Sequence, residues 1–216
     1  MADTVASLVA QVIEEGDFDA DAPRALGWLN RRQRTMVADS RCYRKTTSIG
    51  PTVANQVAYT VPVDVVEILE LTVDGIPYGS ATHLDLAQGP RGYVILDGDG
   101  GVSARTDSSA GVEQVALYPT PTTAGGVISM YAVYRAPDLV SGTDSTLVIP
   151  QEFCEALVAG AIATGLRRTE NRPDLAAPFE EEFAAGVEKL RRRVNRKHRK
   201  SGPARVRVAW GNRTVA

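Results

Sequence analysis

The sequence predicts an α+β fold: helices from both ends of the chain form a bundle around an inserted antiparallel β-sheet or sandwich, and an extended basic tail follows. Three observations lead to this prediction. Apolar residues recur every three or four positions near both ends, the middle of the chain alternates with a period of two, and residues 189–216 contain no Asp or Glu. We therefore expect a helical bundle domain at residues 1–46 and 149–198, a β insertion domain at 47–148 and a C-terminal extension at 199–216.

The N-terminal part predicts two helices. The first covers about residues 4–15, with a cap at Asp3 or Thr4. The second follows Asp21, whose carboxylate can accept the free amide hydrogens of a helix start, and it ends near Asp39. The apolar positions that place these helices are Val5, Leu8, Val9, Val12, Ile13, Leu26, Leu29, Met36 and Val37.

From Thr47 the composition becomes typical of strands. The stretch GPTVANQVAYTVPVDVVEILELTVDGIPY is rich in Val, Ile, Thr and Tyr, and Asp74-Gly75 is a turn sequence before a short return strand. Residues 93–96, 112–118 and 127–135 are further strand candidates, each bounded by Gly, Pro, Asp or Ser. These strands predict a small antiparallel sheet or sandwich.

After residue 148 the helical period returns. A helix through AGAIATG is followed by a break at NRP, and Asp174 is a candidate cap for a final helix. That helix carries three glutamates in its first turns and arginines in its last turns, the polarity that the helix dipole favours. The apolar positions of the two helices are Phe153, Leu157, Ala161 and Leu166 in the first and Leu175, Phe179, Phe183, Val187 and Leu190 in the second.

The sequence offers little chemistry for catalysis or for metal binding. His83 and Asp85 could share one face of a strand but lack a third ligand, and Asp97 and Asp99 fit a hairpin turn better than a calcium loop. The motifs of serine hydrolases, zinc proteases, P-loops and dinucleotide sites are absent. We therefore expect no enzyme, no cofactor and no metal site.

The two cysteines and the hydropathy also narrow the function classes. Cys42 and Cys154 lie far apart without ligand spacing, so we interpret them as buried or incidental thiols, which fits a reducing cytoplasm. No apolar run approaches the roughly 18 residues of a membrane span, and the first residues lack the features of a signal peptide. We expect no membrane partner.

The charge is divided unequally along the chain. Residues 189–216 hold 11 of the 24 Lys and Arg residues, so residues 1–188 keep 13 basic residues against all 26 acidic ones. The body is therefore −13 and the C-terminal part +11. Such a split indicates an acidic partner for the basic part, which nucleic acid, another protein or the body of a neighbouring subunit could provide.

The basic part itself has two sections. KLRRRVNRKHRK, at residues 189–200, could bind DNA phosphates along a helix. In the following RVRVAW, arginines alternate with valines, a pattern that can add as a strand or enter a groove with Trp210 as its anchor. A solubilising tail without a fixed partner is the third alternative.

The order of these segments resembles the bacteriophage head-to-tail adaptor family, including the tail tubular protein A type. The resemblance is carried by YTVPVDVVEIL at residues 59–69, LYPTP at 117–121 and IPQEFCEAL at 149–157, and it covers about residues 4–196. It implies a structural virion protein, assembled in the host cytoplasm, that forms a ring, typically of twelve subunits. Such a ring lies below the portal, continues the channel for double-stranded DNA and receives the next tail component.

The resemblance also implies a C-terminal extension that engages the portal protein. On this interpretation residues 191–200 form a charged stem and residues 205–210 the inserted segment. The docking candidates are Arg191, Arg192, Arg193, Arg196, Lys197, Arg199, Lys200, Arg205, Arg207 and Trp210. The alternative function is a DNA-binding phage accessory or packaging protein that uses the basic helix on phosphates, and some of the same arginines could serve both functions.

Overall fold

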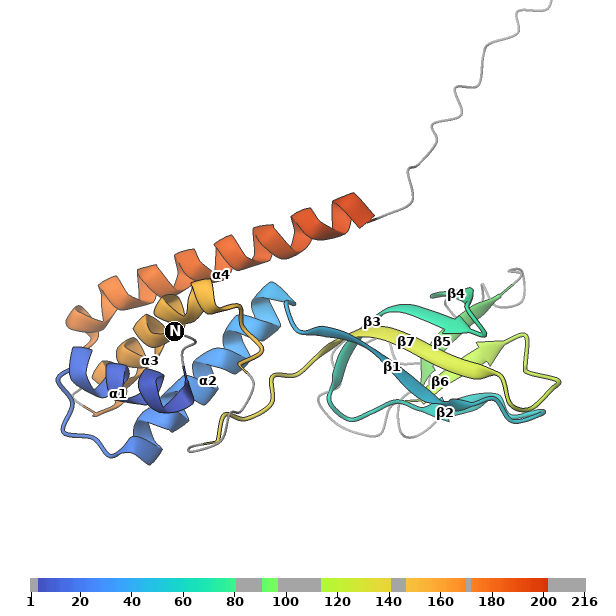
Figure 1. Cartoon of the computed structure of the whole chain (residues 1–216), viewed down its shortest axis with the longest axis horizontal. Helices are drawn as coiled ribbons and strands as arrows, with labels where there is room; N and C mark the ends of the chain where they lie inside the picture. The colour runs from blue at the N-terminus through green and yellow to red at the C-terminus, as the bar shows by residue number, and fades with distance from the viewer. Residues whose placement is uncertain (1–3, 81–90, 97–113, 141–146, 170–171, 202–216) are drawn as a thin grey trace, which may run out of the picture.

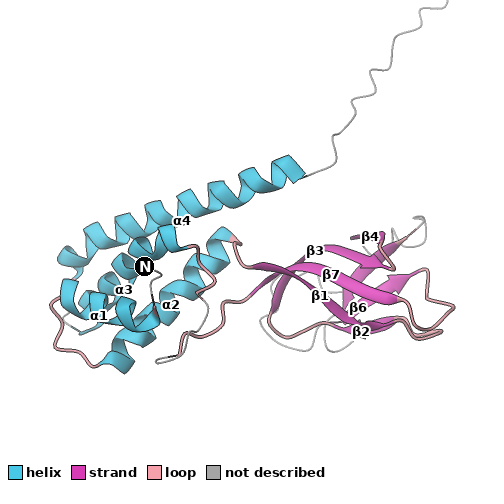
Figure 2. Ribbon diagram, viewed as in Figure 1, coloured by secondary structure: helices cyan, strands magenta, loops and turns pink. Residues whose placement is uncertain are grey.

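The computed structural model describes residues 4–80, 91–96, 114–140, 147–169 and 172–201. It has an α+β fold in which a group of helices lies at one end and a curled sheet at the other (Figures 1 and 2). The described helices are α1 (Val5–Glu15), α2 (Ala22–Ser40), the short 3-10 helix Gln151–Phe153, α3 (Cys154–Thr169) and α4 (Pro173–Ser201).

The predicted starts of the first two helices are confirmed. Thr4 and Ser7 form a reciprocal capping box at the start of α1, and the Asp21 side chain accepts a hydrogen bond from the Arg24 amide at the start of α2. The cap predicted for the final helix is wrong. Because α4 already begins at Pro173, whose fixed φ suits a first helical position, Asp174 lies inside the first turn.

The four helices share one hydrophobic core, and α3 lies at its centre. Every residue of α3 from Ala156 to Leu166 is buried, because the small side chains of its Ala- and Gly-rich sequence let neighbouring helices approach on several sides. In α4, Phe183 and Leu190 face this core as predicted. Leu175 does not: it is 40% exposed, since Ala176 takes the core-facing position of that turn.

Within the described residues the sheet contains seven strands in the order β1-β7-β3-β4-β5-β6-β2, and it encloses a second hydrophobic core. Its strands are β1 (Arg44–Pro51), β2 (Ala58–Thr60), β3 (Val65–Val73), β4 (Ile76–Ser80), β5 (Gly92–Leu96), β6 (Gln114–Tyr118) and β7 (Val127–Tyr134). The first strand begins earlier than the predicted Thr47, because Arg44 to Thr46 pair with the end of β7.

The prediction of a purely antiparallel sheet is wrong at one place. β4 and β5 pair in parallel, with Gly79 opposite Gly92, whereas the other pairs are antiparallel. A parallel pair requires the chain to return to the same end of the sheet before the second strand begins, and this return leaves no periodicity in the strands themselves. The predicted turn at Asp74-Gly75 is confirmed: both residues have positive φ and join β3 to β4.

Side chains of α2 fix the segment that leads back from the sheet to the helices. Asn30 donates to the carbonyl of Leu139 and accepts from its amide, and the buried Gln33 donates to the carbonyl of Pro137. Figure 1 shows that α4 runs past the end of α2 toward this junction between helices and sheet. The middle of the C-terminal half of α4 therefore lies next to this junction.

Candidate docking surface

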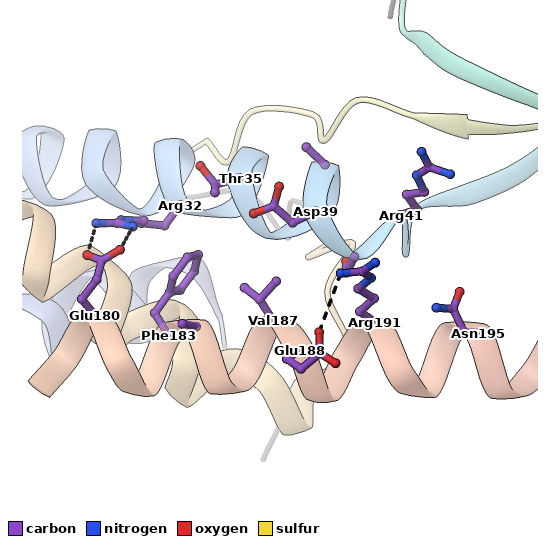
Figure 3. A pocket seen from close by; sticks show the side chains of 13 residues that line it. Arg32, Thr35, Asp39, Arg41, Glu180, Phe183, Val187, Glu188, Arg191 and Asn195 are labelled. Atoms are coloured by element: carbon purple, nitrogen blue, oxygen red, sulfur yellow. Dashed lines mark hydrogen bonds and ion pairs between the residues drawn. The ribbon is translucent and has the colours of Figure 1, made fainter. Parts of the chain in front are cut away.

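The N-terminal half of α4 is held against the other helices by a charged clamp. Arg32 of α2 donates two hydrogen bonds to the carboxylate of Glu180, at 2.8 and 2.7 Å, and a third to the Thr164 hydroxyl of α3, at 2.7 Å. Its guanidinium lies 4.9 Å from the centre of the Phe183 ring. One arginine thus joins α2, α3 and α4, and Figure 3 shows its two hydrogen bonds to Glu180 of α4.

A groove of about 720 Å³ runs between α2 and α4 next to this clamp. Figure 3 shows Phe183 and Val187 pointing from α4 toward α2, with Thr35, Asp39 and Arg41 along the opposite wall. Phe183 is buried at the floor of the groove and Val187 is partly buried, so the groove offers a partner mainly the polar and charged side chains of its walls. Arg191 and Asn195 continue its α4 wall toward the C-terminus.

The predicted docking residues in the described part of α4 differ in how their charge is compensated. Glu188 pairs with Arg192 at 2.8 Å and with Arg191 at 3.9 Å, and both arginine side chains are well exposed. Arg193 turns to the other side of the helix, where it forms an ion pair with Glu152. Arg196 is exposed. The structure therefore brings Arg191, Arg192 and Arg196 to the surface, whereas Arg193 forms a partly exposed ion pair with Glu152 at the start of the 3-10 helix.

The remaining docking candidates cannot be placed in the same way. Lys197, Arg199 and Lys200 lie in the last turns of α4, and their side chains fall outside the described residues. Arg205, Arg207 and Trp210 also lie outside the described residues, as do the sequence candidates His83, Asp85, Asp97 and Asp99.

The described residues contain no group of three His, Cys, Asp or Glu side chains that could hold a metal ion. Both cysteines are free thiols; Cys154 is buried and Cys42 is partly buried. Burial raises the pKa of the Cys42 thiol, although a hydrogen bond with Ser40 and the charge of Arg44 act in the opposite direction. No described helix combines the length and hydropathy needed to cross a membrane.

A second exposed surface lies at the end of the sheet farthest from the helices. The segment after β1 is joined to the segment before β7 by hydrogen bonds from Thr52 to Gly126 and from Asn55 to Pro121. Val53, Val57 and Val127 around this tip are each about half exposed, at 47%, 48% and 51%. These valines lie at the same end of the sheet, where a partner could contact them.

The sequence analysis missed Arg32 and Glu180 of the clamp. A signal for Arg32 was present: it lies three residues after Leu29 and four before Met36, so it falls on the buried stripe of its helix. A charged residue at such a position requires a partner. The sequence contains no comparable signal for Glu180, because one of three consecutive glutamates could equally be solvated.

A platform of packed helices and an exposed basic helix end are features of a protein that contacts other macromolecules, but a fold alone does not assign a function. Residues 3–207 match the family model described as SU10 adaptor protein, and the chain belongs to this family of phage head-to-tail adaptors. No curated protein matches the chain. The narrower likeness to tail tubular protein A stays a prediction.

Family membership gives the coarse function. The protein is a structural adaptor and a virion component, and adaptors of this kind interact with portal and tail components. The family is not known for an enzymatic activity.

Proposed function

We propose that the protein forms a closed ring of twelve subunits, assembled in the host cytoplasm, which docks below the portal and continues the DNA channel toward the tail. The observation that carries this proposal is the family match over residues 3–207, combined with the exposed arginines Arg191, Arg192 and Arg196 on the last described turns of α4. A head-to-tail interface repeated between identical subunits generates a ring when the rotation per subunit closes.

In this proposal α4 and the residues after it form the portal-docking element. Arg191, Arg192 and Arg196 are available on the helix surface, and Glu188 compensates only part of their charge. Arg205, Arg207 and Trp210 follow as the inserted segment, with Trp210 as the residue that contributes most to affinity, since buried tryptophans dominate many interfaces. Lys197, Arg199 and Lys200 complete the charged stem.

The acidic body fits a channel through which DNA must slide. Residues 1–188 carry 26 acidic and 13 basic residues, and a like-charged wall repels phosphates instead of retaining them. The apolar tip around Val53, Val57 and Val127 is the surface that we assign to the next tail component, because it lies at the opposite end of the molecule from the helices.

Mixing with the cognate portal tests the docking element. We expect a ring-on-ring particle in electron micrographs, and Trp210→Ala should weaken the complex by about 2 kcal/mol, or roughly thirtyfold in Kd. Val215→Ala, a second apolar change in the same terminal segment, is the matched control and should leave the affinity unchanged. If Trp210→Ala binds the portal as tightly as the control, the assignment of the inserted segment is wrong.

Exposed arginines on α4 also fit the alternative of a DNA-binding accessory or packaging protein, and a salt series distinguishes the two functions. For the adaptor we expect a Kd for duplex DNA of about 10⁻⁶ M or weaker at physiological salt, lost as salt is added. A Kd near 10⁻⁸ M that is abolished when Arg191, Arg192 and Arg196 are changed to Gln would favour the DNA-binding protein.

A further inference from the structure

The junction between α4 and the sheet contains a small apolar pocket of about 230 Å³. Its apolar walls come from Cys42, Val148, Pro150, Leu190 and Val194. A volume below the roughly 300 to 1,000 Å³ of small-ligand sites suits one large side chain. The pocket draws on the segment after α2, the segment before α3 and the C-terminal half of α4, so its occupant would contact several elements at once.

The rim of this pocket is polar and cationic. Arg44, Tyr131 and Arg193 line it together with the apolar residues. The Arg44 guanidinium is oriented by a hydrogen bond of 2.7 Å to the Arg41 carbonyl, and Arg193 is held by Glu152. Guanidinium groups at the edge of an apolar pocket favour an aromatic occupant, whose ring face attracts cations.

A second hollow adjoins the first, and the two share Pro150 and Arg193. Glu152 and Glu155 line this second hollow, so two carboxylates face the single charge of Arg193. The pair of hollows thus combines a slot for one aromatic side chain with a neighbouring site of surplus negative charge. A matching ligand would carry an aromatic residue a few positions from an arginine.

We propose that residues 205–210 of the same chain occupy these two hollows in the free subunit, with Trp210 in the pocket and Arg205 and Arg207 at Glu152 and Glu155. RVRVAW supplies both chemical features at short spacing. The inference goes beyond the proposed function, because it concerns the subunit before any portal is present and does not depend on portal docking.

The length of the segment after α4 allows this arrangement. From Val194 to the helix end at Ser201 the axis advances about 10 Å. The residues from 202 to 210 can span up to roughly 30 Å when extended, which is enough to turn back and reach the pocket. Gly202 and Pro203 follow the helix directly, and this pair is typical of a change in chain direction.

Combined with the portal docking proposed above, on which this consequence rests, such occupancy would regulate assembly. A portal that binds Trp210 must first withdraw it from the pocket, so the apparent affinity falls in proportion to the undocked fraction. Free subunits would also hide an exposed tryptophan that could otherwise bind wrong partners.

Cys42 provides a direct test, because its thiol lines the pocket that Trp210 would fill. The rate of Cys42 alkylation by N-ethylmaleimide is measured in the full chain, at one pH and by mass spectrometry. We expect Trp210→Ala to accelerate it about tenfold, and the Val215→Ala control to leave it unchanged. Cys154, which is 2% exposed, reports global unfolding in the same samples.

Two further arms keep the outcome clear. Glu155→Gln and added salt should each accelerate Cys42 alkylation in the natural chain but not in Trp210→Ala, since they weaken the contacts of Arg205 and Arg207. The protection of Cys42 against alkylation should be independent of protein concentration. Equal alkylation rates for Trp210→Ala and the Val215→Ala control would overturn the proposal. Protection of Cys42 that grows with protein concentration would also overturn it, because the occupant of the pocket would then come from a second copy of the chain.

Discussion

Arg32→Ala is the perturbation that tests most directly how α4 is held in place. The substitution removes three hydrogen bonds of 2.7 to 2.8 Å, two to Glu180 and one to Thr164, together with the contact to the Phe183 ring. Among the described residues, it leaves the carboxylate of Glu180 with the more distant Arg167, at 3.8 Å, as its remaining ion-pair partner. We expect the helical part of the protein to lose stability and α4 to separate more readily from α2.

The burial of the two partners sets the size of the effect. The Arg32 side chain is 13% exposed and that of Glu180 is 31% exposed. Breaking a fully buried ion pair costs about 3 to 5 kcal/mol and breaking an exposed one about 0 to 1 kcal/mol, so this partly buried pair falls between them at about 2 to 3 kcal/mol. For a chain of this length that loss lowers Tm by about 4 to 12 °C.

Urea unfolding followed by circular dichroism measures the free energy of unfolding. Arg34→Ala is the matched control: it lies on the same helix, but its ion pair with Asp138 is 59% exposed on both sides and should contribute at most about 1 kcal/mol. A double-mutant cycle with Glu180→Gln should give a coupling energy above about 1 kcal/mol. If Arg32→Ala costs no more than Arg34→Ala, the clamp does not hold α4.

Two other predictions follow from packing and from burial. Gly186→Ala would place its new Cβ 2.3 Å from the Cβ of Ala156, so it should lower the free energy of unfolding by about 1 to 3 kcal/mol. Gly27→Ala has open space around the new Cβ and should raise that free energy by up to about 1 kcal/mol. Thermal unfolding measures both changes, and the opposite order of stabilities would contradict the packing of α3 against α4. Because burial raises the pKa of Cys42, its thiolate forms at higher pH than that of an exposed thiol. Its alkylation rate in Trp210→Ala should therefore still rise with pH where a reference peptide has levelled off, and a common plateau would contradict this prediction.

The features that the sequence predicted well are those with local chemical causes. Thr4 and Asp21 cap helices because their own side chains bond the next turn, and Asp74-Gly75 turns because both residues accept positive φ. The parallel pairing of β4 with β5 has no such local cause, since it depends on where the chain returns between them. The exposure of Leu175 likewise depends on which face of the first turn of α4 meets α3.

The candidate site was predictable in composition but not in geometry. The concentration of positive charge after Glu188 is plain in the sequence, and α4 does present Arg191 and Arg192 to solvent. The engagement of Arg193 by Glu152 could not be foreseen, because the partner lies in a different element. The same holds for Arg32 and Glu180, which lie 148 positions apart.

Because the arginines of α4 differ in exposure and in ion pairing, they contribute differently to the rate and to the affinity of partner binding. Arg191 and Arg192 are 61% and 70% exposed, so their hydration is lost only in part on contact, and they mainly accelerate encounter with a negatively charged surface. Arg193 already pairs with Glu152, and both side chains are largely exposed, at 41% and 54%, so exchanging this ion pair for one with a partner adds little net energy. Tight binding therefore has to come from apolar burial beyond the helix, where Trp210 offers the largest surface. Salt therefore separates the two contributions. The association rate, which α4 raises by long-range attraction, should fall as salt is added, whereas the apolar contribution of the following segment to affinity should not.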